Sequence, residues 1–162
     1  MDEAFDVVIV GAGPAGLSAA CLLAENGVKT IVLERGEYPG AKNISGGVLY
    51  GHDLAQILPD YEKRSCPIER NIVESRIWYR SRDGGYSLAY RDKLFANERK
   101  HNAFTVGRAK FDRWFAEQAR GKGALVACGT VVTDLLRDPD HRIVGVQTDR
   151  PDGDLRANVV LL

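Results

Sequence analysis

The chain has 162 residues, about the length of one domain, and 44% of them are hydrophobic, which is enough for a packed core. Lysine plus arginine and aspartate plus glutamate both number 22, so no net basic charge would attract nucleic acid or an anionic membrane. No apolar run approaches the roughly 20 residues of a membrane span. Met1 leads almost directly into the first apolar run, so we expect no signal peptide. We therefore expect a cytoplasmic protein with no nucleic-acid partner.

The cysteines give no sign of a metal site or a disulfide framework. Cys21, Cys66 and Cys128 are far apart in the sequence, and no pair has CxxC spacing. We interpret them as reduced thiols and expect no metal ion or iron–sulfur cluster on this chain.

The N-terminal segment has the pattern of one strand–helix–strand unit. Residues 5–10 (FDVVIV) form a nearly continuous apolar run, which is typical of a parallel strand buried on both faces. A helical segment then extends to about Asn26, Gly27 ends it, and the β-branched run 29–33 is closed by Glu34. This order predicts an α/β fold of the Rossmann type.

Three glycines follow the first predicted strand at GxGxxG spacing. Gly11 permits a sharp turn, Gly13 lets the backbone approach a pyrophosphate, and Gly16 lets the helix pack closely on the sheet. The helix N-terminus adds unpaired N–H groups and the positive end of the helix dipole. Glu34, 18 residues after Gly16, can accept hydrogen bonds from both ribose hydroxyls. Together these features predict a site for an ADP-containing dinucleotide.

The segment 35–47 contains four glycines and one proline, too many for the interior of a helix or strand. It can be a plain connection. However, it leaves the carboxyl end of the second predicted strand, where ligands of open α/β sheets bind. Its donors and glycines suit a cofactor contact: Lys42, Asn43, Ser45, Gly46 and Gly47. We expect this loop to contact the cofactor.

The middle of the chain changes from helical to β-rich patterns. Residues 52–58 predict a short helix stopped by Pro59, and β-rich pieces follow between 68 and 90, with a hairpin turn at residues 83–85. We interpret about 66–102 as the start of an inserted β region of the kind that carries substrate-side surface.

A second helix is predicted to begin near Arg108, after a brief strand at 104–106. Phe111, Trp114 and Phe115 fall on one face of it and are expected in the core. Arg108 lies off that face, at the helix start, where the dipole disfavours a cation. A nearby anion would explain it, so we expect a phosphate or ribose contact rather than an incidental surface arginine.

Short strands dominate the rest of the chain. Four are predicted: a short buried one at 124–127, and then 129–136, 142–148 and 154–162. The last three form a β-meander over about 129–158. The apolar run 159–162 predicts that the final strand enters a sheet covered on both faces. Because ligand contacts normally follow such a strand, we expect residues 1–162 to be the N-terminal part of a longer dinucleotide-binding domain.

Four motifs carry a resemblance to a known group of proteins. In order they are VIVGAGPAG, LERG, GAKNISGGVLYGH and VGRAKFDRWFAEQA. The set resembles glutathione-reductase-like flavoproteins, and within them it is most similar to the electron transfer flavoprotein–quinone oxidoreductase family, in particular its FixC branch. The first motif is shared by many unrelated enzymes. The AKNISGG loop is more discriminating, and so is Arg108 followed by Phe111, Asp112 and Trp114.

The resemblance implies FAD as the cofactor and assigns residues to its parts. In chain order, these are Gly11, Gly13, Pro14, Ala15 and Gly16 at the pyrophosphate, Glu34 and Arg35 at the adenosine ribose, Lys42 to Gly47 near the isoalloxazine, Arg108 on the FAD backbone, and the main chain of Val131 beside the adenine. No catalytic acid, base or nucleophile is identified. Electron transfer between a flavin and a quinone need not have one.

The resemblance also implies partners. These are an electron transfer flavoprotein as donor, a quinone as acceptor, a separate ferredoxin-like iron–sulfur protein, and peripheral contact with the inner face of the membrane. The pathway it implies is electron delivery to nitrogen fixation.

Three other readings remain open. One is a geranylgeranyl-type prenyl reductase, another flavoprotein with the same fingerprint. The second is an NADP-binding module, suggested by Arg35 but disfavoured because Glu34 would repel a 2′-phosphate. The third is a non-catalytic module that binds FAD or ADP.

Overall fold

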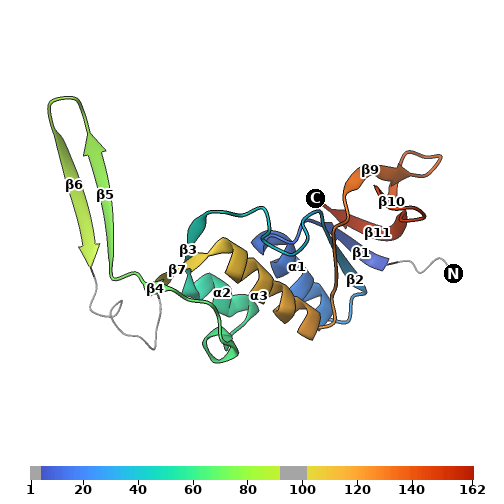
Figure 1. Cartoon of the computed structure of the whole chain (residues 1–162), viewed down its shortest axis with the longest axis horizontal. Coiled ribbons are helices and arrows are strands. Elements are labelled where there is room, and N and C mark those ends of the chain that lie inside the picture. Colours follow the sequence, from blue (N-terminus) through green and yellow to red (C-terminus); the bar gives the residue numbers. More distant parts are fainter. Residues whose placement is uncertain (1–4, 92–101) are drawn as a thin grey trace. The chain divides into compact units, whose positions relative to one another are not determined.

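The computed structural model of the chain describes residues 5–91 and 102–162. It divides into two compact units, one formed by Met1–Ser45 with Arg108–Leu162 and the other by Gly46–Gly107 (Figure 1). The residues 92–101 of the predicted insertion lie outside the described ranges.

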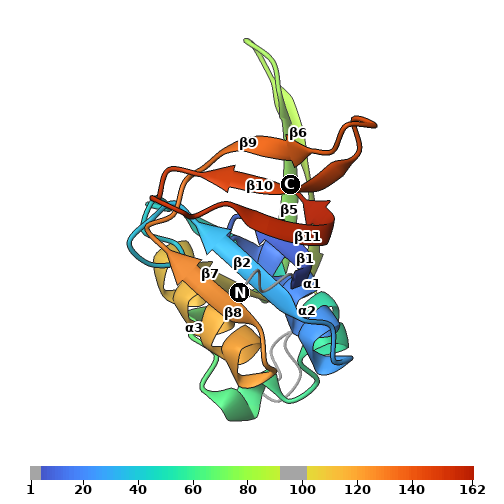
Figure 2. The ribbon, with the colours of Figure 1, turned by 90° about the vertical axis from the view of Figure 1, so that its right-hand side faces the viewer.

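The first unit is built on a sheet in which the chain's first and last described strands are neighbours. Within the described residues the strand order is β8-β2-β1-β11-β10-β9 (Figure 2). Its strands are β1 (Phe5–Val10), β2 (Thr30–Glu34), β8 (Leu125–Cys128), β9 (Val132–Arg137), β10 (Ile143–Thr148) and β11 (Leu155–Leu161). Strands β8, β2, β1 and β11 run parallel, whereas β9 and β10 are antiparallel to their neighbours. This mixed sheet confirms the predicted α/β class.

Two helices pack against each other and against the parallel strands. Helix α1 (Pro14–Glu25) contacts β1 and β2, and α3 (Arg108–Gly121) contacts β8 and α1. Both helices bury small residues, such as Ala20 of α1 and Ala119 of α3, which allows close approach. None of the helices in the described ranges is long and apolar enough to cross a bilayer.

The β-meander (β9, β10 and the start of β11) contributes to an apolar cluster on the sheet. Phe5 and Val8 of β1 pack there with residues of β2, and Val146 and Ala157 contribute from the meander strands. Strand β11 connects the antiparallel meander to the parallel strands, because its first residues pair with β10 and its later ones pair with β1.

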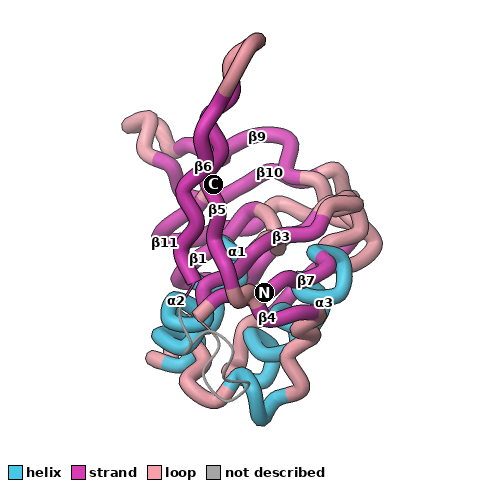
Figure 3. The backbone as a smooth tube through the Cα atoms, turned by 90° about the vertical axis from the view of Figure 1, so that its left-hand side faces the viewer, coloured by secondary structure: helices cyan, strands magenta, loops and turns pink. Residues whose placement is uncertain are grey.

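The second unit contains a small sheet and a separate hairpin. Strands β3 (Gly46–Tyr50), β7 (Ala103–Gly107) and β4 (Arg70–Asn71) are antiparallel neighbours in that order (Figure 3). The short helices α2 (Gly51–Ile57) and η1 (Tyr61–Arg64) follow β3. Phe104 is fully buried, with its ring centroid 5.7 Å from that of Tyr61. Burial raises the pKa of the Cys66 thiol to about 12, so this cysteine is protonated at neutral pH.

The hairpin consists of β5 (Glu74–Arg80) and β6 (Gly85–Arg91), joined near the predicted turn. Its residues from Ser75 onward are exposed on both faces, and the rings of Tyr79 and Tyr86 stack across its two strands with 4.8 Å between centroids. Glu74 and Arg91 face each other where its two strands meet the rest of the chain.

Three predicted elements differ from the structure. Gly46 and Gly47 were expected at the end of the 35–47 loop but begin β3, because β7 supplies a pairing edge that is remote in sequence. The strand predicted as buried at 124–127 is β8, an edge strand on which Leu125 is 55% exposed. The final run does pair with β1, yet Val159 remains 49% exposed rather than covered on both faces.

Candidate dinucleotide-binding site

The turn between β1 and α1 is shaped by its three glycines. Gly11 has a φ of +102°, a conformation that residues with a Cβ rarely adopt, and its N–H donates to the carbonyl of Leu33 at 2.8 Å. A Cβ on Gly16 would overlap the carbonyl oxygen of Gly11, so only glycine lets the helix begin this close to the strand. A Cβ on Gly13 would meet nothing within 4 Å. The turn therefore leaves open space at Gly13, where a phosphate can approach the backbone.

The N-terminus of α1 is prepared for an anion. Gly13 is the N-cap and Pro14 the first helical residue; no side chain caps the helix, and its first turn holds no acidic residue. The first N–H groups of a helix have no intrahelical partners, and the dipole is positive at this end. A pocket of about 380 Å³ opens beside the turn. It is lined by Ile9, Val10, Gly11, Gly13, Ala15, Gly16, Ala19, Leu161 and Leu162.

Glu34, at the end of β2, is fixed by two backbone donors. Its Oε2 accepts the N–H of Ala12 at 2.9 Å, and its Oε1 accepts the N–H of Gly36 at 2.7 Å. The carboxylate thus links the turn between β1 and α1, called the phosphate turn below, to the start of the loop that follows β2. Each carboxylate oxygen keeps a further lone pair, so ribose hydroxyls can still donate to it. Arg35 beside it is exposed.

The segment after β8 lies next to the end of β2, since Thr130 donates its N–H to the carbonyl of Glu34 at 3.0 Å. Val131 donates its N–H to Asp149 Oδ1 at 2.9 Å, and its carbonyl accepts the N–H of Asp149, also at 2.9 Å. Both main-chain groups assigned to the adenine by resemblance are therefore already engaged. An adenine contact through Val131 stays a prediction, and the N–H would first have to leave Asp149.

Sequence reasoning missed the residues that hold this segment. The Nη2 of Arg150 donates to the carbonyls of Cys128 and Gly129, at 2.8 and 3.0 Å. Asp149 and Arg150 lie in the turn between β10 and β11, about 20 positions after the backbone that they bind. An arginine in an exposed turn is common, so the sequence carries no signal for this contact.

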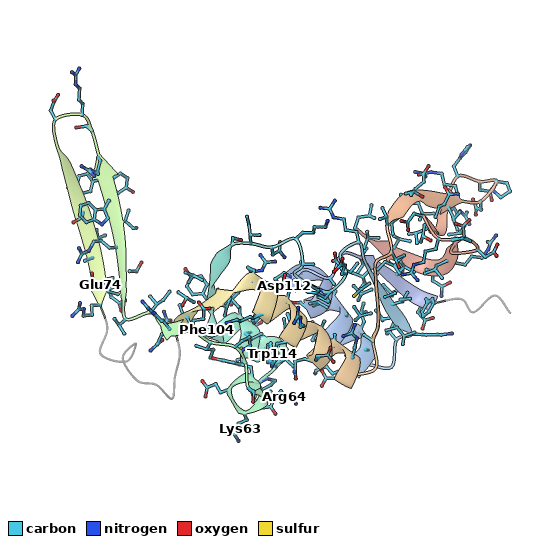
Figure 4. All side chains as sticks on the ribbon, in the orientation of Figure 1. Lys63, Arg64, Glu74, Phe104, Asp112 and Trp114 are labelled. Atoms are coloured by element: carbon cyan, nitrogen blue, oxygen red, sulfur yellow. The ribbon has the colours of Figure 1, made fainter. Side chains whose placement is uncertain are left out.

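Arg108 does have an anionic partner, and that partner belongs to the protein. Its Nε and Nη2 donate to Oδ1 and Oδ2 of Asp112, each at 3.0 Å, and this bond raises the pKa of the guanidinium. Asp112 lies on α3 (Figure 4) and is fully buried. An anion does lie beside Arg108, as its place at the helix start led us to expect, and it is the Asp112 carboxylate. The FAD contact of Arg108 stays a prediction, which the Nη1 group is still able to make.

The loop residues assigned to the cofactor have different surroundings. Asn43 donates its Nδ2 to Asp112 Oδ2 at 2.7 Å, and the carbonyl of Ser45 accepts the N–H of Arg108 at 3.2 Å. The Lys42 side chain is exposed. Gly46 and Gly47 lie in β3 of the second unit, where Gly46 pairs with Gly107.

The donors and spaces of the first unit fit the ADP half of FAD. The open face of Gly13 and the uncapped helix suit a pyrophosphate, and the Glu34 carboxylate suits a ribose. The residues that would hold the group are thus those of the turn, of α1 and of the end of β2.

Sequence comparison assigns the chain to a family. The family model described as FAD dependent oxidoreductase matches residues 6–161. Over 162 residues, the chain is 43% identical to protein FixC of Bradyrhizobium diazoefficiens and 44% identical to protein FixC of Azorhizobium caulinodans. Each alignment covers 100% of this chain but 37% of the relative, so the chain spans little more than a third of the length of these relatives.

Solved structures show the same fold. A geranylgeranyl bacteriochlorophyll reductase-like protein from Thermoplasma acidophilum matches with a TM-score of 0.77 at 23% identity, over 98% of this chain and 38% of that one. Aklavinone-11 hydroxylase, solved with FAD and aklavinone, matches with a TM-score of 0.67 at 26% identity, over 99% and 33%. The fold and the FixC-like resemblance predicted from the sequence are confirmed, and the chain belongs to the FAD dependent oxidoreductase family, with FAD as its cofactor.

Proposed function

We propose that this chain holds the ADP half of FAD in a FixC-like oxidoreductase that takes electrons from an electron transfer flavoprotein and delivers them to a quinone. The observation that carries the proposal is similarity to FixC proteins along the whole chain, at 43–44% identity, over alignments that span all 162 residues. The shared glycine turn alone would not separate FixC from other flavoproteins.

The flavin, when bound, supplies the electron-transfer chemistry. The protein binds and orients it: the turn at Gly13 and the start of α1 hold the pyrophosphate, and Glu34 holds the ribose. Glu34 is already hydrogen-bonded to Ala12 and Gly36, so little reorganisation is needed when the ribose arrives.

The role includes partners that complete the electron path. Besides the donor flavoprotein and the quinone, a ferredoxin-like iron–sulfur protein would carry the cluster that this chain's three scattered cysteines do not provide for. Peripheral contact with the inner face of the membrane would give access to the quinone. In this role the enzyme delivers electrons to nitrogen fixation.

The prenyl reductase alternative has weaker support. The geranylgeranyl reductase-like structure shares the fold at 23% identity, which carries no argument about the substrate. No feature of the described residues favours a prenyl chain over a quinone.

The test uses the full-length protein that contains this chain. Purified with its flavin, it is mixed with a reduced electron transfer flavoprotein and a soluble quinone analogue, and quinone reduction is followed by absorbance. We expect turnover that depends on both partners. A parallel incubation with a geranylgeranyl substrate, analysed by chromatography, should give no saturated product. Formation of the saturated prenyl product without quinone reduction would favour the prenyl reductase over the quinone-reducing role.

A further inference from the structure

Asp112 is a buried carboxylate to which the flavin role assigns no function. It lies in the second turn of α3 (Figure 4) and has no exposed surface. Its oxygens accept three hydrogen bonds: two from the Arg108 guanidinium and one from the Asn43 amide. A buried charge is costly unless it is paired, and here each oxygen has a partner.

The two partners lie on segments far apart in sequence. Arg108 is on the same helix, four residues earlier, whereas Asn43 is 69 positions away in the loop after β2. Asp112 Oδ2 is shared between them, with Arg108 Nη2 at 3.0 Å and Asn43 Nδ2 at 2.7 Å. One carboxylate therefore sets the position of two groups that the resemblance assigns to FAD.

The rest of this loop also lies along the first turns of α3. A Cβ on Gly40 would collide with Ala109 and Asp112, so the loop backbone approaches the helix as closely as glycine permits. The Arg113 guanidinium lies 4.1 Å from the centroid of the Tyr38 ring, and the carbonyl of Ser45 accepts the N–H of Arg108. Among these contacts, the Asp112 carboxylate alone binds both the loop and the Arg108 side chain.

We propose that Asp112 is a positioning residue of the flavin site, which holds the Asn43 loop and the Arg108 guanidinium in one arrangement ready for the cofactor. The inference rests on the FAD role proposed above. With Nε and Nη2 directed to Asp112, Arg108 keeps its Nη1 group for an anionic or hydroxyl oxygen of the cofactor. Without Asp112, both the loop and the guanidinium would have to be ordered when FAD binds, and that cost would weaken binding.

The loop can be examined without FAD. Lys42 is exposed and immediately precedes Asn43, so a lysine-specific protease can cut between them once the loop detaches from α3. In the flavin-free full-length protein, we expect Asp112→Asn and Asn43→Ala to increase cleavage at Lys42 at least fivefold, as measured by mass spectrometry. Glu117→Gln is the matched control, because it removes an exposed ion pair with Arg120 on the same helix and should leave the rate unchanged.

The link to FAD is tested by a double-mutant cycle on the dissociation constant. Asn43→Ala is expected to weaken FAD about tenfold and Asp112→Asn more. If Asp112 acts through Asn43, adding Asn43→Ala to Asp112→Asn should change the affinity less than twofold. Asn43→Ala removes only a half-buried amide, so it keeps the test valid even if Asp112→Asn folds poorly.

Two results would overturn the inference: unchanged cleavage at Lys42 in Asn43→Ala, or unchanged FAD affinity in both single variants despite a lower unfolding temperature. The second would make the network structural only. Failure of the proposed function is a separate result, in which the unmutated protein binds FAD yet does not reduce quinone, or binds no FAD while the protease comparison still holds.

Discussion

Individual glycines in the phosphate turn have different physical roles, and substitutions should separate them. Gly13 has φ −82° and open space around its missing Cβ, so Gly13→Val should fold normally. The valine methyls would occupy the place of the pyrophosphate, and FAD affinity should fall at least about tenfold, or 1.4 kcal/mol. Gly16→Ala instead forces a Cβ against the Gly11 carbonyl and should cost about 1–3 kcal/mol of stability.

Thermal unfolding and flavin content of the full-length protein, measured on the same samples, check both expectations. Gly13→Val should melt near the parent protein's temperature but lose its yellow colour on dialysis, whereas Gly16→Ala should melt lower. A yellow Gly13→Val protein would mean that the phosphate is not bound at this turn.

Residue-level prediction from the sequence reached furthest where chemistry and spacing were local. Glu34 ends β2 close to the glycine turn, because its distance from the glycines is set by one strand–helix–strand unit, and its contact with a ribose stays a prediction. The need of Arg108 for an anion also followed from its place at a helix start, but the sequence could not tell a phosphate from Asp112. Asp149 was missed because its bonds to Val131 depend on how the meander folds back.

The β5–β6 hairpin gives a prediction about pH. Glu74 accepts hydrogen bonds from Arg91 and Arg76, which lower the pKa of its carboxyl below the ordinary 4.5. A lowered pKa means that the ion pairs stabilise the hairpin above pH 4.5 and that this contribution is lost as the pH falls through the lower, folded value. We therefore expect the two strands to loosen in acid below pH 4.5.

Tryptophan fluorescence can follow this transition, because Trp78 lies on β5, 5.8 Å from the Arg76 guanidinium. Trp114→Phe removes the other tryptophan signal. Glu74→Gln in that background should give at neutral pH the emission that the parent shows in acid, with no acid transition of its own. The same titration in both proteins would exclude Glu74 as its cause.

Elements were predictable when their signals were continuous. The strand at 5–10 has the expected bounds and α3 begins at Arg108 as expected, since an apolar run marks the first and periodicity the second. Strand β3 was not predictable, because Gly46 and Gly47 argue against a strand and its partner β7 is more than 50 residues away. The exposure of Leu125 on β8 likewise depends on which strand ends the sheet.

For the molecule as a whole, the groups that face a ligand in the first unit recognise pyrophosphate and ribose, which FAD and ADP share. We expect the 162-residue chain to bind both with similar dissociation constants of roughly 10–100 µM, or about 5.5–7 kcal/mol. Isothermal titration calorimetry measures both on one preparation. Similar affinities for FAD and ADP would mean that the 162 residues by themselves are a non-catalytic module that binds FAD or ADP.

AMP, which has the ribose but no pyrophosphate, is the control and should bind more weakly than ADP. An affinity for FAD far higher than that for ADP, together with quinone reduction by the 162-residue chain, would show that these residues also bind and cover the isoalloxazine.

The pairing of β1 with β11 has a consequence for biosynthesis. Phe5 pairs with Ala157, so one edge of β1 stays unpaired until residues 152 positions later have been synthesised. The hydrogen bond from Asn158 to Asp6 spans the same separation. At ribosomal rates of about 5–20 residues per second, the interval between synthesis of β1 and synthesis of β11 is roughly 8–30 s. During this time, the apolar edge made first is open to other chains. Nascent protein should therefore depend on chaperones until β11 emerges, and pauses in translation before Leu155 should raise aggregation more than pauses after Leu161.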